Sequence, residues 1–356
     1  MSVTLYTGSD DQISIRAAPL AELGACLHAL AEPDHHPLSR QWIDTVRAED
    51  NEELIGQILS LSPLWGPVRA RYLLPMTPDT TRSFEEELSD ILELPLVEFT
   101  RLTAQALLAS TSHRPPPDVM QNVEAADDFL VTLRHMSWQR AELGTSLVAD
   151  PEAFRNRLLR VLNLAYAAMF THEWAQLHPM LAADVTRRRS DQHLHGSVVL
   201  SDFSIATELD DPPRVVFDKL YVASARLTDT PCVLVPSRHV NPHFVIKHLP
   251  GYPVVIQYAV AADTSTPSTK TVQQRLAVLN EPTRLAICRS ILRRPMAGIE
   301  LARLLDMTPP QVSRHLRKLR EAGLVHHYRD GSVVRYELDR DAVRRIGVDL
   351  ILSLRR

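Results

Sequence analysis

The stretch TPPQVSRHLRKLREAGL, residues 308–324, constrains the fold more strongly than any other part of the chain. Thr308 suits a helix N-cap and Pro309 suits the first helical position, so a helix is predicted to begin there. Gly323, at the far end, is typical of the left-handed residue that follows a helix. Apolar residues recur at i, i+4 and i+7 and are expected to face a core: Val312, Leu316 and Leu319. The sequence therefore predicts a short helix with one buried stripe and a basic outer face.

The segments on either side complete a compact motif. PTRLAICRSILRR, residues 282–294, predicts a helix with Leu285, Cys288, Ile291 and Leu292 on one face. GIELARLL, residues 298–305, predicts a shorter helix, and a three-residue connection leads from it to the basic one. Two helices joined by a tight turn, the second basic and outward-facing, are typical of a helix-turn-helix. Beyond the second helix, VHHYR and SVVRYEL indicate two strands, and Asp330-Gly331 between them is a two-residue hairpin signal. The sequence thus predicts a winged helix-turn-helix.

Three segments resemble the ArsR type of winged helix: NEPTRLAICRSIL, IELARLLDMTPPQVSRHLRKLREAGLV and RDGSVVRYEL. The resemblance implies a homodimeric, repressor-like regulator that binds an inverted-repeat operator in double-stranded DNA and responds to a signal. Residues 12–260 resemble, more loosely, an uncharacterised domain that accompanies such winged helices in bacterial regulators. That second resemblance depends on APLAELGACLHAL, on residues 174–184 and on CVLVPS.

The distribution of charge supports a division of the chain. Residues 269–356 contain 18 Lys+Arg and 9 Asp+Glu, a net of +9, whereas residues 1–268 contain 21 and 34, a net of −13; the sum is the formal −4. A basic module on an acidic body is the electrostatic layout of a DNA-binding domain joined to another domain. The small, polar stretch AADTSTPSTKT, residues 261–271, is predicted to be the linker between residues 1–260 and 272–356.

The body, residues 1–260, is predicted to be α+β. Helical apolar spacing dominates up to about residue 186, interrupted by the prolines of HRPPPD at 113–118. Shorter β-rich runs follow after residue 210, so helices are expected first and a small sheet later. The three isolated cysteines, the lack of a signal-peptide pattern and the lack of a long apolar run predict a cytoplasmic protein without a membrane partner.

The basic helix and the hairpin supply the candidate DNA contacts. Arg314 is the leading candidate for reading a base, since a guanidinium bonds guanine O6 and N7 together; a phosphate contact is the alternative. Gln311 has two open roles, base reading or a capping box with Thr308. His315, near the buried edge, is expected to pack or to bond the backbone, with a DNA contact as the alternative. The complete candidate set is Thr308, Pro310, Gln311, Ser313, Arg314, Arg317, Lys318, Arg329, Ser332 and Arg335.

No metal, cofactor or catalytic site is predicted. The ArsR resemblance places thiolate ligands at the positions of Ala297 and Ile299, neither of which can coordinate a metal. Cys288 is expected to be a small buried apolar residue. The histidines, including His35, His36, His239 and His243, form no recognised zinc spacing and are interpreted as scattered loop residues. No Gly-x-Ser-x-Gly, phosphate-cradling or His-Glu-x-x-His motif occurs, so the chain is not expected to be an enzyme.

Residues 1–260 are predicted to sense a non-metal signal, with a small-molecule effector as the candidate partner. Five aromatic residues in helical stretches are candidates to line an apolar pocket, with core packing as the alternative: Trp65, Trp138, Tyr166, Phe170 and Trp174. The alternative function is a DNA-anchored scaffold whose body binds another protein and no small molecule. A self-complementary dimer interface is predicted from flanking apolar residues: Val272, Leu276, Leu279, Val343, Ile346, Leu350, Ile351 and Leu354.

Overall fold

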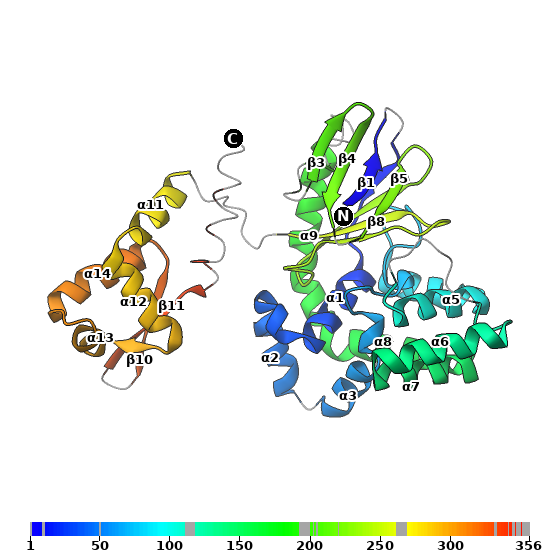
Figure 1. The fold of residues 1–356 in the computed structure, drawn as a ribbon, viewed down its shortest axis with the longest axis horizontal. Coiled ribbons are helices and arrows are strands. Elements are labelled where there is room, and N and C mark those ends of the chain that lie inside the picture. The colour runs from blue at the N-terminus through cyan, green and yellow to red at the C-terminus, as the bar shows by residue number, and fades with distance from the viewer. Residues whose placement is uncertain are drawn as a thin grey trace. The chain divides into compact units, whose positions relative to one another are not determined.

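The computed structural model describes residues 2–8, 11–49, 51–110, 118–191, 200–201, 203, 206–219, 221–260, 269–330, 333–340, 342–343, 346 and 350. The chain divides into two compact units, Met1–Ala262 (unit 1) and Asp263–Arg356 (unit 2). Unit 1 carries both helices and sheets, and unit 2 is a small helical domain with a hairpin (Figure 1). Each unit therefore has its own mixture of helix and strand.

Unit 1 contains two four-stranded sheets. Their strands are β1 Ser2–Tyr6, β2 Ile13–Ile15, β3 Ala206–Asp210, β4 Pro213–Asp218, β5 Ala223–Arg226, β6 Cys232–Ser237, β7 Val245–Lys247 and β8 Val254–Ala259. One sheet has the order β3-β4-β1-β5 and the other β2-β6-β8-β7. β1 pairs antiparallel with β4 and parallel with β5, whereas β2, β6 and β8 are parallel neighbours. Strands from both ends of the unit thus complete each sheet.

The sequence interpretation missed the two N-terminal strands. It placed helices first and one small sheet later, whereas β1 and β2 precede every helix and join the later strands. β1 alternates buried and half-buried residues, with Val3 and Leu5 fully buried, so its period of two was present in the sequence. β2 has only three residues, which is too short for any periodicity to show. Pairing with β6, far along the chain, forms that strand.

Helices make up the rest of unit 1. They are α1 Pro19–Ala31, α2 Arg40–Ala48, α3 Glu52–Ser60, α4 Phe84–Glu93, α5 Leu96–Leu107, α6 Val123–Met136, α7 Trp138–Ala149, α8 Pro151–Ala165 and α9 Thr171–Asp191, with short 3-10 turns η1 Pro33–His35, η2 Pro37–Ser39, η3 Ser62–Leu64 and η4 Arg71–Leu73. A π-helical turn, η5 Tyr166–Phe170, joins α8 to α9. Side-chain caps start several of these helices: Ser83, Asn122, Ser137 and Asp150. Residues 111–117, which include most of the predicted HRPPPD break, lie outside the described part.

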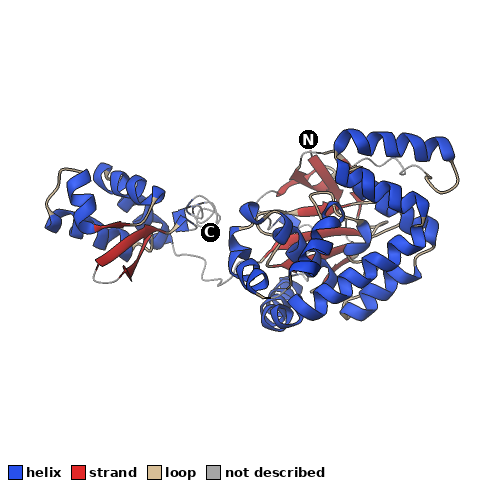
Figure 2. Ribbon diagram, turned by 90° about the horizontal axis from the view of Figure 1, so that it is seen from below, coloured by secondary structure: helices blue, strands red, loops and turns tan. Residues whose placement is uncertain are grey.

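Two large cores hold unit 1 together. One is formed almost entirely by helices and includes Trp65, Phe99 and Phe170. The other lies against the sheets and α9 and includes Phe217 and Tyr258. Trp174 on α9 packs against both, so this long helix connects the helical part to the sheets. Figure 2 shows the strands of each unit packed against the helices of the same unit.

Unit 2 is a winged helix-turn-helix, as the sequence predicted. Its elements are α11 Thr269–Leu279, α12 Pro282–Arg293, β9 Met296–Ala297, α13 Gly298–Leu304, α14 Pro309–Glu321, β10 Val325–Asp330 and β11 Val333–Leu338. The strands form one sheet in the order β10-β11-β9. The predicted stripe of α14 is buried in the core of this unit: Val312, Leu316 and Leu319. Together with the unit 1 architecture, this makes the chain α+β.

Three local expectations for unit 2 were wrong. The predicted linker reached Thr271, but α11 begins at Thr269; residues 261–268 lie outside the described part. Asp330 is paired with Val333 in the hairpin, so it belongs to the strand and not to the connecting pair. On α12 the buried residues include Ile287, whereas Leu285 and Leu292 are 51% and 42% exposed. Cys288 and Ile291 of the predicted face are buried, and Ile287 joins them in place of Leu285 and Leu292, because α12 packs against α14 and β11 along the side that carries Ile287.

Candidate nucleic-acid interface

The second helix of the helix-turn-helix, α14, is fixed at its start by its own side chains. The Oε1 atom of Gln311 accepts hydrogen bonds from the Thr308 backbone N–H at 2.9 Å and from the Thr308 hydroxyl at 3.0 Å. Of the two roles left open for Gln311, the structure therefore shows the capping contact. The turn before α14 places Asp306 at φ +52°, a left-handed conformation that Asp tolerates better than most residues.

The face of α14 opposite the buried stripe is polar and exposed. Its exposed residues are Gln311, Ser313, Arg314, Arg317 and Lys318, and the exposed Thr308 and Pro310 precede them. Arg317 lies 3.8 Å from Glu321 in an exposed ion pair of the kind that contributes little to stability. Arg314 makes no ion pair or hydrogen bond with the described residues, which leaves its guanidinium available to an external partner.

His315 and Arg284 have structural roles. His315 is half-buried, and its Nδ1 lies 3.2 Å from Glu281, whose carboxylate caps α12 by accepting from the Thr283 and Arg284 backbone N–H groups. His315 is therefore engaged inside the domain, but by a side-chain carboxylate and not by the backbone group expected from the sequence. The side chain of Arg284 donates to the backbone carbonyls of Val278 at 2.5 Å and Ala277 at 3.3 Å. The Arg284 hydrogen bonds connect α12 to α11. Because His315 and Arg284 both contact groups within unit 2, neither side chain is directed to an external partner.

The wing is the antiparallel hairpin of β10 and β11. Arg329 pairs with Val334 next to the chain reversal and is exposed, in keeping with a contact to a phosphate backbone. Arg335 is half-buried, with its Nη1 atom 3.5 Å from Glu300, so this carboxylate competes with any phosphate for it. Ser332, another candidate contact, lies outside the described residues.

Cys288 is a buried core residue, as predicted from its position. Burial raises the pKa of its thiol to about 11. A protonated, buried thiol is a poor metal ligand. The neighbouring Ala297 and Ile299 offer no ligand atoms either, so the described part of unit 2 does not reproduce the thiolate site that the ArsR resemblance would place there.

The five aromatic residues proposed for a ligand pocket are not assembled around one cavity. Tyr166, Phe170 and Trp174 follow one another on the α8–α9 segment, with ring centroids 5.8 Å apart at each step. Trp65 is fully buried in the helical core, whereas Trp138 is 77% exposed. From the sequence, core packing is the alternative to lining a pocket. The structure shows core packing for Trp65 and Phe170.

A cleft of about 990 Å³ lies elsewhere in unit 1. Its lining includes Trp42, Thr45, Met169, Glu173, Arg238 and His239. The indole N–H of Trp42 donates to the Met169 carbonyl at 3.3 Å, within the π-helical turn. Such turns recur at functional sites. Residues so far apart in sequence leave no spacing pattern, so sequence reasoning had no signal for this cleft.

His239 is held in the cleft wall by two hydrogen bonds. Its Nδ1 lies 2.9 Å from the Ser39 hydroxyl and its Nε2 lies 2.9 Å from the Glu173 carboxylate. This resembles a hydrolytic triad only in composition, because Ser39 is 1% exposed and does not line the cleft. A buried hydroxyl cannot reach a substrate, so the arrangement orients the imidazole and does not supply a nucleophile.

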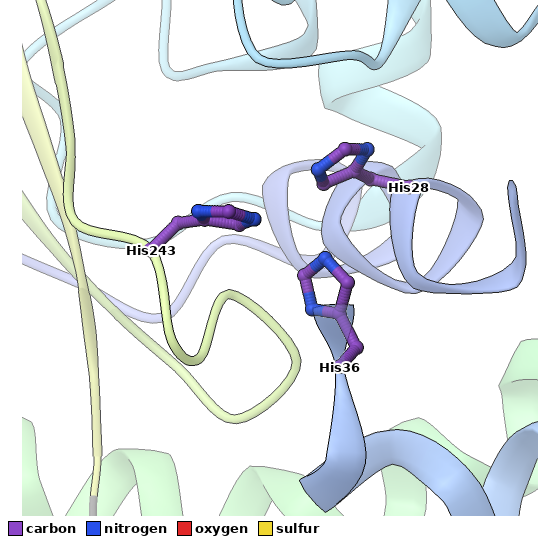
Figure 3. A group of neighbouring side chains, drawn as sticks. All are labelled: His28, His36 and His243. Carbon is purple, nitrogen blue, oxygen red and sulfur yellow. The ribbon is translucent and has the colours of Figure 1, made fainter. Parts of the chain in front are cut away.

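Two groups of side chains in the described residues have donor atoms close enough to hold a metal ion. One is His28, His36 and His243, and the other is Glu22, Cys26 and His239. The imidazoles of the first group face one another in Figure 3. The interpretation of His36 and His243 as scattered loop residues was therefore wrong. The fold brings them together from distant segments, which no local spacing could reveal.

Comparison with known proteins identifies both units. Residues 1–264 match the family of unknown function DUF5937. The chain belongs to this family. Residues 281–327 match the bacterial regulatory protein, arsR family. This DUF5937 protein therefore carries, after its family domain, a DNA-binding domain of the type found in bacterial transcriptional regulators.

The curated and solved relatives share only part of this DUF5937 chain. The HTH-type transcriptional regulator KmtR of Mycobacterium tuberculosis is 37% identical over 76 residues, which cover 21% of this chain and 58% of KmtR. Among solved structures, NolR from Sinorhizobium fredii is 26% identical over 26% of this chain and 96% of its own, with a TM-score of 0.22. Reduced HlyU from Vibrio cholerae is 25% identical over 24% and 90%, with a TM-score of 0.21. A possible ArsR-family regulator domain from Mycobacterium bovis, described as homodimeric, is 22% identical over 27% and 90%, with a TM-score of 0.22.

Among the described helices, none combines the length and the apolar character that crossing a membrane requires.

Proposed function

We propose that the protein is a cytoplasmic transcriptional regulator that binds an inverted-repeat operator as a homodimer and acts as a repressor. One observation carries the proposal: α14 buries one stripe in the core and presents Arg314 and its exposed neighbours on the other side. In helix-turn-helix proteins this is the helix that enters the major groove. The net +9 of residues 269–356 supplies the non-specific attraction to phosphate.

The experiment compares two arginines with different expected roles. Arg314→Ala is expected to weaken operator binding by about 1–3 kcal/mol and to relax the preference at one base position per half-site. Arg329→Ala, at the wing, is expected to weaken operator and scrambled DNA alike and to reduce the salt slope by about 1 per domain. Fluorescence-anisotropy titrations of both variants, on both duplexes at several salt concentrations, measure these effects. If Arg314→Ala lowers both affinities equally, Arg314 is a phosphate contact.

The homodimer is supported by apolar surface on the first two helices of unit 2. Leu276, Leu285 and Leu292 are 39%, 51% and 42% exposed. Of the residues predicted for the interface, Val272 and Ile346 are instead buried, and Ile351 and Leu354 lie outside the described part. The interface is therefore proposed to include the exposed leucines of α11 and α12. Sedimentation should show a dimer at micromolar concentration without DNA, and a monomer for Leu285→Glu with Leu292→Glu; a wild-type monomer would contradict this.

Unit 1 is proposed to sense a small, polar, non-metal effector in the cleft beside His239. The support is the volume of the cleft together with convergent polar groups, Glu173, Arg238 and His239, on an apolar wall that includes Trp42. A metabolite panel screened by thermal shift should yield a compound that raises the melting temperature of the wild type. Glu173→Gln should reduce that shift. Gln57→Glu, at a half-buried position on α3 outside the cleft lining, should leave it unchanged.

The alternative, a DNA-anchored scaffold, is favoured by the surface of α6 and α7. Val123 and Trp138 are 79% and 77% exposed, which is unusual for large apolar side chains. Two results together would favour the scaffold over the sensor. No compound of the metabolite panel would stabilise the protein, and a protein partner that binds the wild type would fail to bind Trp138→Ser.

A further inference from the structure

Three histidines from three separate segments converge in unit 1. His28 lies in the last turn of α1, His36 lies between η1 and η2, and His243 follows β6 in the loop that leads to β7. The ring centroids are 4.9 Å apart for His28 and His36, 5.3 Å for His28 and His243, and 4.9 Å for His36 and His243. In Figure 3 the rings point toward a common centre. The elements that carry them are fixed independently, so the convergence is a property of the tertiary fold.

The same nitrogen of each ring is left without a partner. The Nε2 atoms of His28, His36 and His243 are buried and make no hydrogen bond with the described residues. A buried polar atom without a partner is rare in proteins and destabilises the fold. Three such atoms in one place have a common explanation if they bind one ion that accepts a lone pair from each nitrogen.

The orientation of His36 shows how a lone pair is presented. Its Nδ1 lies 2.8 Å from the Asn241 carbonyl oxygen, which can only accept, so Nδ1 carries the proton and donates it. Nε2 is then the unprotonated nitrogen. Metal-bound histidines commonly donate their second ring N–H to a backbone carbonyl in this way.

The electrostatic surroundings keep the imidazoles neutral. Burial, assisted by the charge of Arg69, lowers the pKa of His28 to about 3, and burial lowers the pKa of His36 to about 4 and shifts the pKa of His243 in the same direction. Neutral rings do not have to lose a proton before coordinating. Burial lowers the pKa of Arg69 to about 10, and the charge of the Glu22 carboxylate acts in the opposite direction. The positive charge of Arg69 opposes a cation, and the negative charge of Glu22 offsets part of it.

The neighbouring group is a poorer alternative. Both nitrogens of His239 are engaged, by Ser39 and Glu173, and one oxygen of Glu22 accepts the backbone N–H groups of Arg238 and His239. Burial also holds the pKa of Cys26 well above its usual range, so its thiolate is disfavoured. Every member of the three-histidine group offers an unengaged nitrogen. The second group offers one unengaged Glu22 oxygen beside a fully engaged histidine and a thiol that resists ionisation.

We propose that His28, His36 and His243 bind one divalent transition-metal ion of the zinc type through their Nε2 atoms. Neutral imidazoles select zinc, cobalt, nickel or copper over magnesium or calcium. One ring nitrogen from each of the three histidines lies within 4.8 Å of the other two, and a tetrahedral ion would draw its ligand nitrogens to about 3.4 Å from one another. Such an ion ties the end of α1 to the 3-10 turns and to the β6–β7 loop. The proposal concerns metal binding by unit 1 and does not depend on DNA binding.

The test uses the full chain, stripped with a chelator and titrated with Zn²⁺ or Co²⁺ alone. We expect one ion per chain, visible bands of tetrahedral Co²⁺, and a rise in melting temperature on adding Zn²⁺. His243→Asn is the main variant because His243 is half-buried in a loop; it should weaken Zn²⁺ binding at least tenfold. His35→Gln is the matched control, since His35 adjoins His36 but is exposed, and it should bind like the wild type. Failure to bind at micromolar Zn²⁺, or equal affinities of wild type and His243→Asn, would overturn the proposal.

A second measurement does not depend on how the variants fold. Zinc-edge X-ray absorption of the wild type should show three imidazole nitrogens in the first shell and no sulfur. A sulfur ligand would assign the ion to the Cys26 group and overturn the three-histidine site. DNA binding is measured in separate titrations, so either proposal can fail without the other.

Discussion

Unit 1 buries charged and polar side chains, whereas unit 2 carries its charge on the surface. The buried charged residues of unit 1 include Arg16, Glu22, Arg69, Arg71 and Glu87. Among the described residues of unit 2, no Lys, Arg, Asp or Glu side chain is buried to that degree. The two units therefore place charged residues differently: unit 1 buries several of them, whereas the described part of unit 2 keeps them at least partly exposed.

The physical consequence differs between the units. A buried charge must be paired, and its partners create an interior that can hold a small ligand or ion. An exposed charge is individually worth little for stability but adds to a field that attracts a polyanion. This difference in charge placement is consistent with the proposed site inside unit 1 and the proposed DNA-binding surface of unit 2.

The largest effect is expected at the Arg16–Glu87 ion pair. Both side chains are buried, at 1% and 5% exposure, and their closest atoms are 2.7 Å apart. Arg16→Met leaves the Glu87 carboxylate buried with only the Leu20 N–H bonded to it, and should lower the free energy of unfolding by about 3–5 kcal/mol. Urea unfolding followed by tryptophan fluorescence measures unit 1 alone, because all four tryptophans precede residue 262. Arg317→Met, in the exposed pair of unit 2, should cost less than about 1 kcal/mol, measured by hydrogen–deuterium exchange of α14 peptides; equal losses would refute the contrast.

Lys247 gives the next effect, with a defined pH dependence. Burial, followed by the charges of Arg71 and Arg69, lowers its pKa to about 8 from the ordinary 10.5. Between pH 8 and 10.5 the unfolded chain binds more protons, so the contribution of Lys247 to stability rises with pH in this window. Lys247→Met should therefore stabilise unit 1 by about 2 kcal/mol at pH 7, and the gain should shrink by pH 10.

The control for Lys247 is Lys318, which is exposed on α14. Lys318→Met should change stability little at either pH. A Lys247→Met gain that is the same at pH 7 and pH 10 would show that the effect comes from packing and not from the buried charge.

Backbone strain should affect both units equally, because it does not depend on charge. Gly323 follows α14 at φ +66°, and Gly251 lies in unit 1 at φ +86°. Each Gly→Ala change is expected to cost about 1–2 kcal/mol, since a Cβ is disfavoured in this conformation. Hydrogen–deuterium exchange of peptides from α14 and from β8 reports the two units separately. A cost confined to one unit would mean that local rigidity, and not only charge placement, distinguishes them.

The smallest effect is expected at the cap of α14. Gln311→Ala removes the acceptor for the Thr308 N–H and should lower the stability of α14 by about 0.5–1 kcal/mol. Gln311→Glu keeps an acceptor at this position and should preserve stability, measured by exchange of the α14 peptides. Altered base preference in Gln311→Ala, with exchange unchanged, would assign Gln311 to base reading instead.

Unit 2 could be largely predicted because its signals are local. The cap at Thr308, the stripe of Val312, Leu316 and Leu319, and the helix end at Gly323 all lie within one helix and its neighbours. Helical period and capping act over a few residues, so a single sequence contains them. The face of α12 was misjudged because Leu285 and Ile287 are both apolar, and only packing against α14 and β11 decides between them.

Unit 1 shows what the sequence could not determine. The sequence by itself determined a basic winged helix after an acidic α+β body, since composition and short-range periodicity are properties of the chain. Only the tertiary structure decided that β1 and β2 join strands more than 200 residues later, that His239 meets Ser39 and Glu173, and that His28, His36 and His243 share one centre. These contacts depend on where independently formed elements pack together. No local pattern records that choice, because it results from burying the apolar faces of many elements at once.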